Sequence, residues 1–205
     1  MRTLGLAIAG LTLVVFLLVH LLGLLPALAA PAIFERSATA LHHQPWLPLL
    51  ELLLLGLLLT HPLLALAQTW RQRAALGPGP RVLRSRRAPA EQLAARAGRW
   101  MPWSGLLLLL FLALHLFQLR WQRPGDGQEL VALQAALAQP WSLALYSAAG
   151  VALGLHLLHG VEAAHRRLGW WWPDQGGAIR SVGRTVAWLL AFGFTLLPLA
   201  LVLQP

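Results

Sequence analysis

The sequence predicts an all-α integral membrane protein with five transmembrane helices and its N-terminus inside. Of the 205 residues, 58% are hydrophobic and only 11% are charged, which is typical of a membrane protein. The apolar residues form five blocks, each long enough to cross a hydrocarbon core of about 30 Å as a helix. The arginines gather in the loops between these blocks, and this asymmetry indicates the orientation.

Composition also excludes several kinds of site. The chain has no cysteine, so disulfides, thiolate metal sites and cysteine nucleophiles are excluded. The net charge of +9 comes from sixteen basic residues, all arginine, against seven acids. Because these arginines flank membrane spans, lipid headgroups and topology explain them, and we expect no nucleic-acid binding.

The predicted elements follow from the apolar blocks. The five spans cover about residues 4–28, 46–69, 101–121, 141–165 and 183–203. The first block resembles a signal peptide in ending on Ala27-Leu28-Ala29, but it is longer than a typical apolar core of roughly 7–15 residues and contains His20, so we expect it to be retained. Residues 72–99, rich in Pro, Gly and Arg, are predicted to be a linker with a short amphipathic helix near residues 91–99.

Orientation follows from the arginines. Cytoplasmic loops are enriched in Lys and Arg. One side of the predicted topology carries Arg2, the linker arginines and those between spans four and five, whereas the other carries only Arg36, Arg120 and Arg123. The linker is therefore predicted to be cytoplasmic and the C-terminus to lie outside.

One histidine lies deep in each of the first four spans. At about 1.5 Å per residue, His20 and His115 fall in the outer half of the membrane, and His61 and His156 in the inner half, about 15 Å away. Two imidazoles at one depth can supply both axial ligands of a b-type heme. The first four helices are thus predicted to form a heme-binding bundle with one heme at each level. The alternative is that each histidine is an isolated hydrogen-bond donor between helices.

The third and fourth spans carry motifs of a known family. The third reads Ser104-Gly105, an apolar run, and then His115-Leu116-Phe117-Gln118-Leu119-Arg120. The fourth reads Ala149-Gly150-Val151, His156, His159-Gly160 and Gly169. With these motifs the chain resembles the diheme cytochrome b membrane anchor of succinate dehydrogenase and quinol:fumarate reductase.

The resemblance implies functions for several residues. It implies that His20 and His115 ligate an outer heme iron, that His61 and His156 ligate an inner one, and that His159 borders the heme pocket; His159 in place of His156 is the alternative ligand. The departures are a very short segment before the first span, Leu24 where an asparagine can stand, and Gly154 where some fumarate reductases carry a proton-conducting glutamate.

The resemblance also implies partners and a location. These are an iron-sulfur subunit and a flavoprotein subunit on the cytoplasmic side of a bacterial inner membrane, and a quinone, for which menaquinone is favoured. The dicarboxylate chemistry would take place on the partner subunits. The alternatives are a diheme b subunit of another respiratory complex and an anchor or transporter without heme.

Some positions remain open between two interpretations. Glu51 is predicted to be a proton relay at a quinone site, or an interfacial carboxylate hydrogen-bonded between helices. His42 and His43 either border that site or are solvated. His165, Arg166 and Arg167 are predicted to reach the interface, and a heme propionate contact is the alternative for one of the two arginines. Gly150 and Gly154 serve either helix packing or clearance for a porphyrin.

Overall fold

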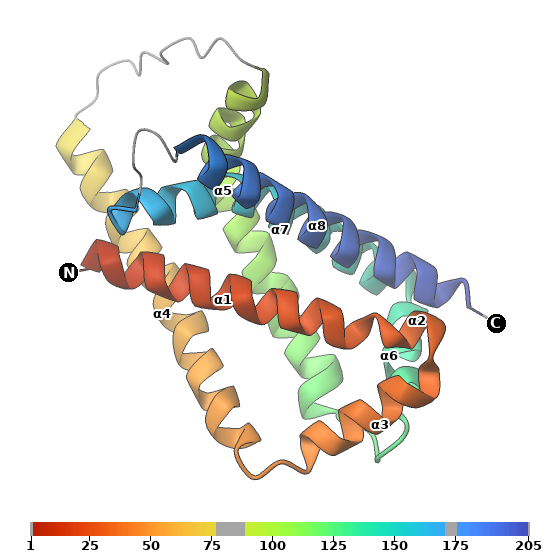
Figure 1. The fold of residues 1–205 in the computed structure, drawn as a ribbon. Helices are drawn as coiled ribbons and strands as arrows, with labels where there is room; N and C mark the ends of the chain where they lie inside the picture. Colours follow the sequence, from red (N-terminus) through yellow and green to blue (C-terminus); the bar gives the residue numbers. More distant parts are fainter. Residues whose placement is uncertain (1, 77–88, 171–175, 205) are drawn as a thin grey trace.

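The computed structural model describes residues 2–76, 89–170 and 176–204, and in these residues it is helical without any strand. The elements are α1 (Arg2–Leu24), α2 (Pro26–Ala29), α3 (Pro31–His42), α4 (Leu47–Leu76), α5 (Pro89–His115), the π-helical segment η1 (Leu116–Trp121), α6 (Glu129–Leu137), α7 (Pro140–Arg167) and α8 (Gly176–Val202). Figure 1 shows their arrangement.

In the described part of the chain, five helices are long and apolar enough to cross a membrane, which confirms this part of the prediction. They are Leu4–Ala29, Leu47–Arg71, Arg96–Trp121, Pro140–Arg167 and Gly176–Val202. The chain is therefore a multi-pass integral membrane protein. The two termini lie at opposite ends of the molecule (Figure 1), as an odd number of crossings requires.

Two differences from the prediction concern the segments between spans. The linker predicted at residues 72–99 is shorter, because α4 continues to Leu76 and α5 begins at Pro89; residues 77–88 lie outside the described part. Proline suits the first turn of a helix, and the amphipathic helix predicted near residues 91–99 is the beginning of α5. The short helices α3 and α6 were not predicted, because their apolar faces are too short to be distinguished from loops.

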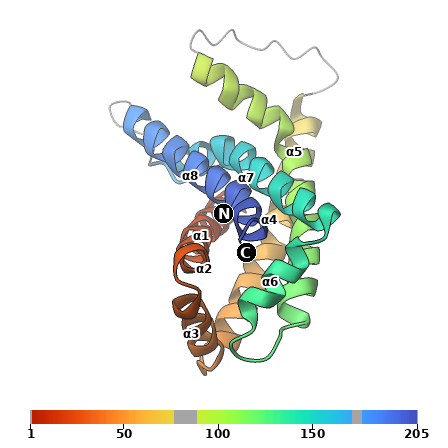
Figure 2. The same cartoon turned by 90° about the vertical axis from the view of Figure 1, so that its right-hand side faces the viewer.

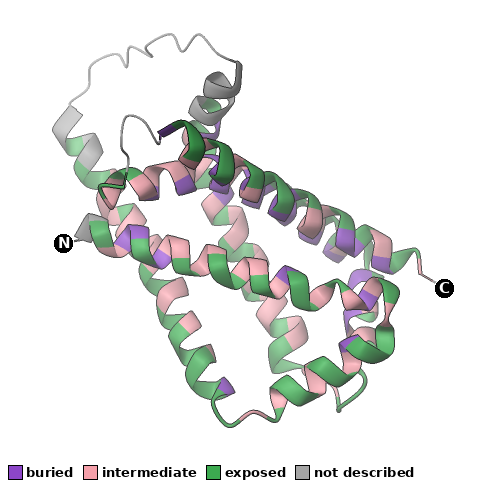
Figure 3. Ribbon diagram, viewed as in Figure 1, coloured by how far each residue is buried: buried purple, intermediate pink, exposed green. Residues whose placement is uncertain are grey.

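The spans pack in two layers. In Figure 1, α1, α7 and α8 run across the view and α4 and α5 run down it; Figure 2 shows the layers from the side. Contacts of α1 with α4 and of α5 with α7 join the layers, whereas in the described residues α4 does not pack closely on α5 or α7. Half of the most apolar stretch of α7 is buried and none of that of α4 is, as the colours of Figure 3 illustrate.

The close approach of α7 and α8 depends on glycine. A Cβ atom at Gly150 would lie 2.5 Å from Oγ1 of Thr195, and one at Gly154 would lie 2.6 Å from Cβ of Ala191. Both neighbours are on α8. The structure therefore favours helix packing over porphyrin clearance for these two glycines.

One end of the bundle is closed by α2, α3 and α6, and we call it the capped end. Glu35 on α3 accepts hydrogen bonds from the backbone N–H groups of Glu129 and Leu130, at 3.1 and 2.8 Å, and so caps the N-terminus of α6. Gln204 donates to the carbonyl of Leu28 at 2.8 Å. The capped end therefore ties the residues after α8 to α2.

Replacing Gly154 by alanine should destabilise the protein by about 1–3 kcal/mol, because the added methyl group overpacks the contact with α8. Gly56→Ala on α4 is the matched control, because a Cβ there meets nothing within 4 Å, and it should be neutral or stabilising by up to about 1 kcal/mol. Thermal unfolding in detergent measures both. Equal effects of the two variants would contradict the packing role.

Candidate functional site

His20 on α1 and His115 at the end of α5 face each other near the capped end. Their ring centroids are 6.1 Å apart, with 86° between the ring planes. Phe16 and Phe194 stack on the ring of His20 at 5.4 and 6.1 Å. This first pair joins two helices that are far apart in the sequence and encloses its imidazoles among aromatic rings.

His61 on α4 and His156 on α7 form the second pair, with ring centroids 6.2 Å apart and 59° between the planes. Two glycines lie beside these rings. A Cβ at Gly10 of α1 would lie 3.1 Å from Cε1 of His61, and one at Gly105 of α5 would lie 3.6 Å from Cε1 of His156. The helices α1, α4, α5 and α7 therefore all contribute backbone or side chain to this level.

These glycines also measure the separation of the two pairs. Gly10 precedes His20 by ten residues on α1, and Gly105 precedes His115 by ten residues on α5. At about 1.5 Å per residue, the two levels are about 15 Å apart along the helices. The histidines thus pair as their depths predict, whereas ligation itself stays a prediction.

Two hydroxyl groups contact the paired histidines. The Tyr146 hydroxyl oxygen lies 3.3 Å from Nδ1 of His115, and the Ser104 hydroxyl oxygen lies 3.3 Å from Nδ1 of His156. Both hydroxyl-bearing residues are buried. The sequence analysis predicted no role for either residue, and it includes Ser104 only as part of a motif. Tyr146 could have been identified because it is the only tyrosine in the chain and lies in a membrane span.

The arrangement suits axial ligation of a heme. An imidazole–metal bond is about 2 Å long, so two axial imidazoles have ring centres about 6 Å apart. The described residues hold no group of three or more His, Asp or Glu that could bind a bare metal ion. Two protein ligands suffice for a heme iron, because the porphyrin occupies its other coordination positions. Nδ1 of His61 is buried and has no hydrogen-bond partner among the described residues.

His159 lies against α5 rather than between His61 and His156. A Cβ at Gly98 would come within 2.9 Å of its Nδ1. Gly98 precedes Gly105 by seven residues, so this contact is about 10 Å from the second pair along α5, away from the capped end. The geometry supports His156 as the paired histidine; a pocket role for His159 stays a prediction.

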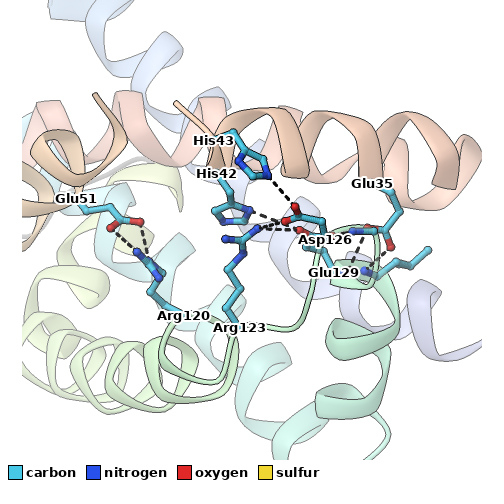
Figure 4. A network of polar contacts seen from close by, with 10 residues as sticks. Glu35, His42, His43, Glu51, Arg120, Arg123, Asp126 and Glu129 are labelled. Carbon is cyan, nitrogen blue, oxygen red and sulfur yellow. Dashed lines mark hydrogen bonds and ion pairs between the residues drawn. The ribbon is translucent and has the colours of Figure 1, made fainter. Parts of the chain in front are cut away.

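Glu51 makes a two-pronged ion pair with Arg120. Nε and Nη2 of Arg120 donate to the two carboxylate oxygens, each at 2.7 Å, as Figure 4 shows. The side chains are 33% and 46% exposed. The pair links α4 to η1, the continuation of α5, and it is the hydrogen bond between helices that was one of the two interpretations of Glu51. The relay role stays a prediction, and it requires this ion pair to open.

Further polar groups lie beside this pair at the capped end. Figure 4 shows His42 between Glu51 and Glu129. Nδ1 of His42 and Nη2 of Arg123 lie 3.6 and 3.5 Å from the same carboxylate oxygen of Glu129. His43 is more exposed and contacts Asp126 at 2.7 Å. The structure thus places His42, but not His43, in a largely enclosed position near Glu51.

The carboxyl groups of Glu35 and Glu129 are hydrogen-bonded to each other. Burial raises the pKa of Glu35, and the bond to Glu129 raises it further. Burial opposes ionisation of Glu129, but its hydrogen bonds from Glu35, the backbone and Arg123 together lower its pKa. The pKa values of the two carboxyl groups are therefore displaced in opposite directions.

Two basic side chains at the other end of α7 have partners in the chain. Nδ1 of His165 donates to the carbonyl of Val161 at 2.9 Å, and the ring contacts Trp170 at 5.9 Å between centroids. Arg166 pairs with Glu162 one turn earlier. These contacts favour an interfacial position over a propionate contact for His165 and Arg166.

In comparisons with known proteins, no protein-family model, no curated protein and no solved structure matches the chain.

Stability should fall on acidification because of His42. Burial, reinforced by Arg123, lowers its pKa below 6.5. The unfolded chain therefore takes up a proton first as the pH drops below about 6.5, and the unfolded state gains relative to the folded one. His42→Gln should lose less stability between about pH 7 and pH 5 than the wild type. Thermal unfolding at both values measures this, and parallel curves would contradict it.

Glu51 and Arg120 should be energetically coupled. Because both side chains are partly exposed, a double-mutant cycle of Glu51→Gln and Arg120→Gln should give a coupling free energy of about 0.5–1 kcal/mol that shrinks at high salt. The pair Arg166 and Glu162, within one helix, serves as comparison and should give about 0.3–0.5 kcal/mol. Additive effects at Glu51 and Arg120 would show that the ion pair does not stabilise the contact between α4 and η1.

Proposed function

We propose that this protein is the diheme cytochrome b subunit of a succinate:quinone oxidoreductase or quinol:fumarate reductase. The observation that carries the proposal is the pairing of four histidines from four different membrane helices, at two levels about 15 Å apart. Isolated packing donors would have no reason to meet in pairs. The motifs around His115 and His156 support this family over other respiratory complexes.

In this proposal, four histidines bind the hemes and neighbouring residues enclose the imidazole rings. His20 and His115 hold one heme b near the capped end, and His61 and His156 hold the other. Bound there, the two hemes supply one-electron carriers at two depths of the membrane. The chain's own residues exclude water from the rings and orient them: Phe16 and Phe194 stack on His20, and Gly10 and Gly105 leave the space beside the second pair free of side chains.

The separation of α4 from α5 and α7 also supports the proposal. In the described residues α4 packs closely on α1 alone among the other spans, yet His61 reaches across to His156. A flat group held between α4 and α7 would account for this separation, because membrane helices otherwise associate by close packing.

The sidedness and the partners belong to the same proposal. With the N-terminus inside, the arginine-rich segments of the opposite end face the cytoplasm, where they would dock an iron-sulfur subunit bound to a flavoprotein. The capped end then faces outward, and a quinone, for which menaquinone is favoured, would bind near Glu51 and His42. Glu51 would exchange protons with it after release from Arg120. The location is a bacterial inner membrane.

Heme content tests the proposal. The purified full chain should show two b hemes per chain in a dithionite-reduced minus oxidised spectrum. His20→Ala, His115→Ala and their double variant should each lose the same single heme, whereas His61→Ala and His156→Ala should lose the other, because both ligands of a pair serve one iron. His43→Ala and His159→Ala are the controls and should retain both.

Other outcomes separate the alternatives. If His156→Ala retained both hemes and His159→Ala lost one, the ligand would be His159 rather than His156. A well-folded wild-type chain that binds no heme would contradict the proposal and favour an anchor or transporter. Two hemes without association with succinate dehydrogenase or fumarate reductase subunits would favour another respiratory complex.

A further inference from the structure

The hydroxyl groups of Tyr146 and Ser104 determine which nitrogen of two histidines carries hydrogen. A hydroxyl has one hydrogen to donate. Ser104 donates it to the carbonyl of Met101 at 3.1 Å, and a carbonyl can only accept. The contact of 3.3 Å between the Ser104 oxygen and Nδ1 of His156 is therefore a bond in which Nδ1–H donates. Nε2 of His156 keeps its lone pair.

The same reasoning applies to the other pair. Tyr146 donates its hydrogen to Oε1 of Gln118 at 3.2 Å, and Nε2 of Gln118 donates to the Ser142 hydroxyl at 3.3 Å. The Tyr146 oxygen therefore accepts from Nδ1–H of His115, at 3.3 Å. Nε2 of His115 is left unprotonated, the form in which an imidazole binds a metal.

The two pairs thus share the same hydrogen-bond arrangement, although different residues supply the hydroxyl group. In each pair one imidazole, that of His115 or His156, donates Nδ1–H to a buried hydroxyl that is itself polarised by donating onward. Ser104 comes from α5 and serves a histidine on α7, whereas Tyr146 comes from α7 and serves a histidine on α5. The helices α5 and α7 pack directly against each other, so each holds the other's histidine.

Resting on the proposed function, we propose that Tyr146 and Ser104 are positioning residues that hold His115 and His156 in the iron-binding tautomer and set the reduction potentials of the two hemes independently. A hydrogen bond from Nδ1–H to an acceptor raises the basicity of the ligating nitrogen. A more basic ligand stabilises the oxidised, more positive iron. Each hydroxyl therefore lowers the potential of its own heme.

Potentiometric titration of Tyr146→Phe and Ser104→Ala, in the full chain with its hemes, tests the proposal. Tyr146→Phe keeps the aromatic ring, whose centroid lies 4.8 Å from that of Phe111. It should raise the potential of the heme at His20 and His115 alone, with a shift of the reduction equilibrium of about tenfold, or about 59 mV for one electron. Ser104→Ala should raise the other potential alone. His156→Ala, which should retain only the heme of the first pair, assigns the two values.

A neighbouring hydroxyl is the matched control. Ser147 lies next to Tyr146 on α7, and its Oγ is buried without a hydrogen-bond partner among the described residues. Ser147→Ala should leave both potentials unchanged. Ser104→Thr keeps a hydroxyl at this position. Its second potential should therefore lie closer to the wild-type value than that of Ser104→Ala.

If Tyr146→Phe does not retain its heme, Gln118→Leu tests the same chain of bonds. Tyr146 then remains but loses its own acceptor, and a hydroxyl that no longer donates is a weaker acceptor, so a smaller rise of the same potential is expected. Unchanged potentials in variants that retain two hemes would overturn the inference, as would equal shifts in Ser147→Ala. These results differ from a wild-type chain without heme, which would contradict the proposed function itself.

Discussion

The free-energy cost of placing an imidazole in hydrocarbon determines how the membrane helices of this protein are oriented. A polar side chain within a membrane span must find a polar partner or a bound group, and four of the five spans carry a histidine at depth. Each of these histidines faces another across the bundle. The rotations of α1, α4, α5 and α7 about their axes follow from this requirement, because turning any one of them outward would expose an imidazole to lipid.

The fifth span, α8, supports α7 by close packing. It carries no histidine, and it packs along α7 through small residues, with Gly150 and Gly154 allowing the backbones to approach. Small residues are the usual means of close packing where water provides no hydrophobic drive between helices. As a result α7 is held on one side by α8 and on another by α5, and it forms the rigid element on which His156 and Tyr146 are placed.

The capped end shows how polar groups are managed where the chain leaves the membrane. Glu35 caps α6 with both carboxylate oxygens, and its carboxyl group contacts that of Glu129. Glu51 and Arg120 join α4 to η1 with two parallel hydrogen bonds. These polar contacts join α3, α4, η1 and α6 in addition to the apolar packing of Phe34, Leu133 and Leu137, which suits an interface where water is available.

The sequence by itself determined the membrane class, the five spans and the pairing of histidines by depth, because span length, arginine placement and a rise of about 1.5 Å per residue depend on local geometry alone. It did not reveal α3 and α6, whose amphipathic faces are short, nor the partner of Glu51, which lies 69 residues away. It also could not assign Tyr146 and Ser104 to His115 and His156. Only the tertiary structure decided these contacts, since they depend on how neighbouring helices are rotated and how closely they approach.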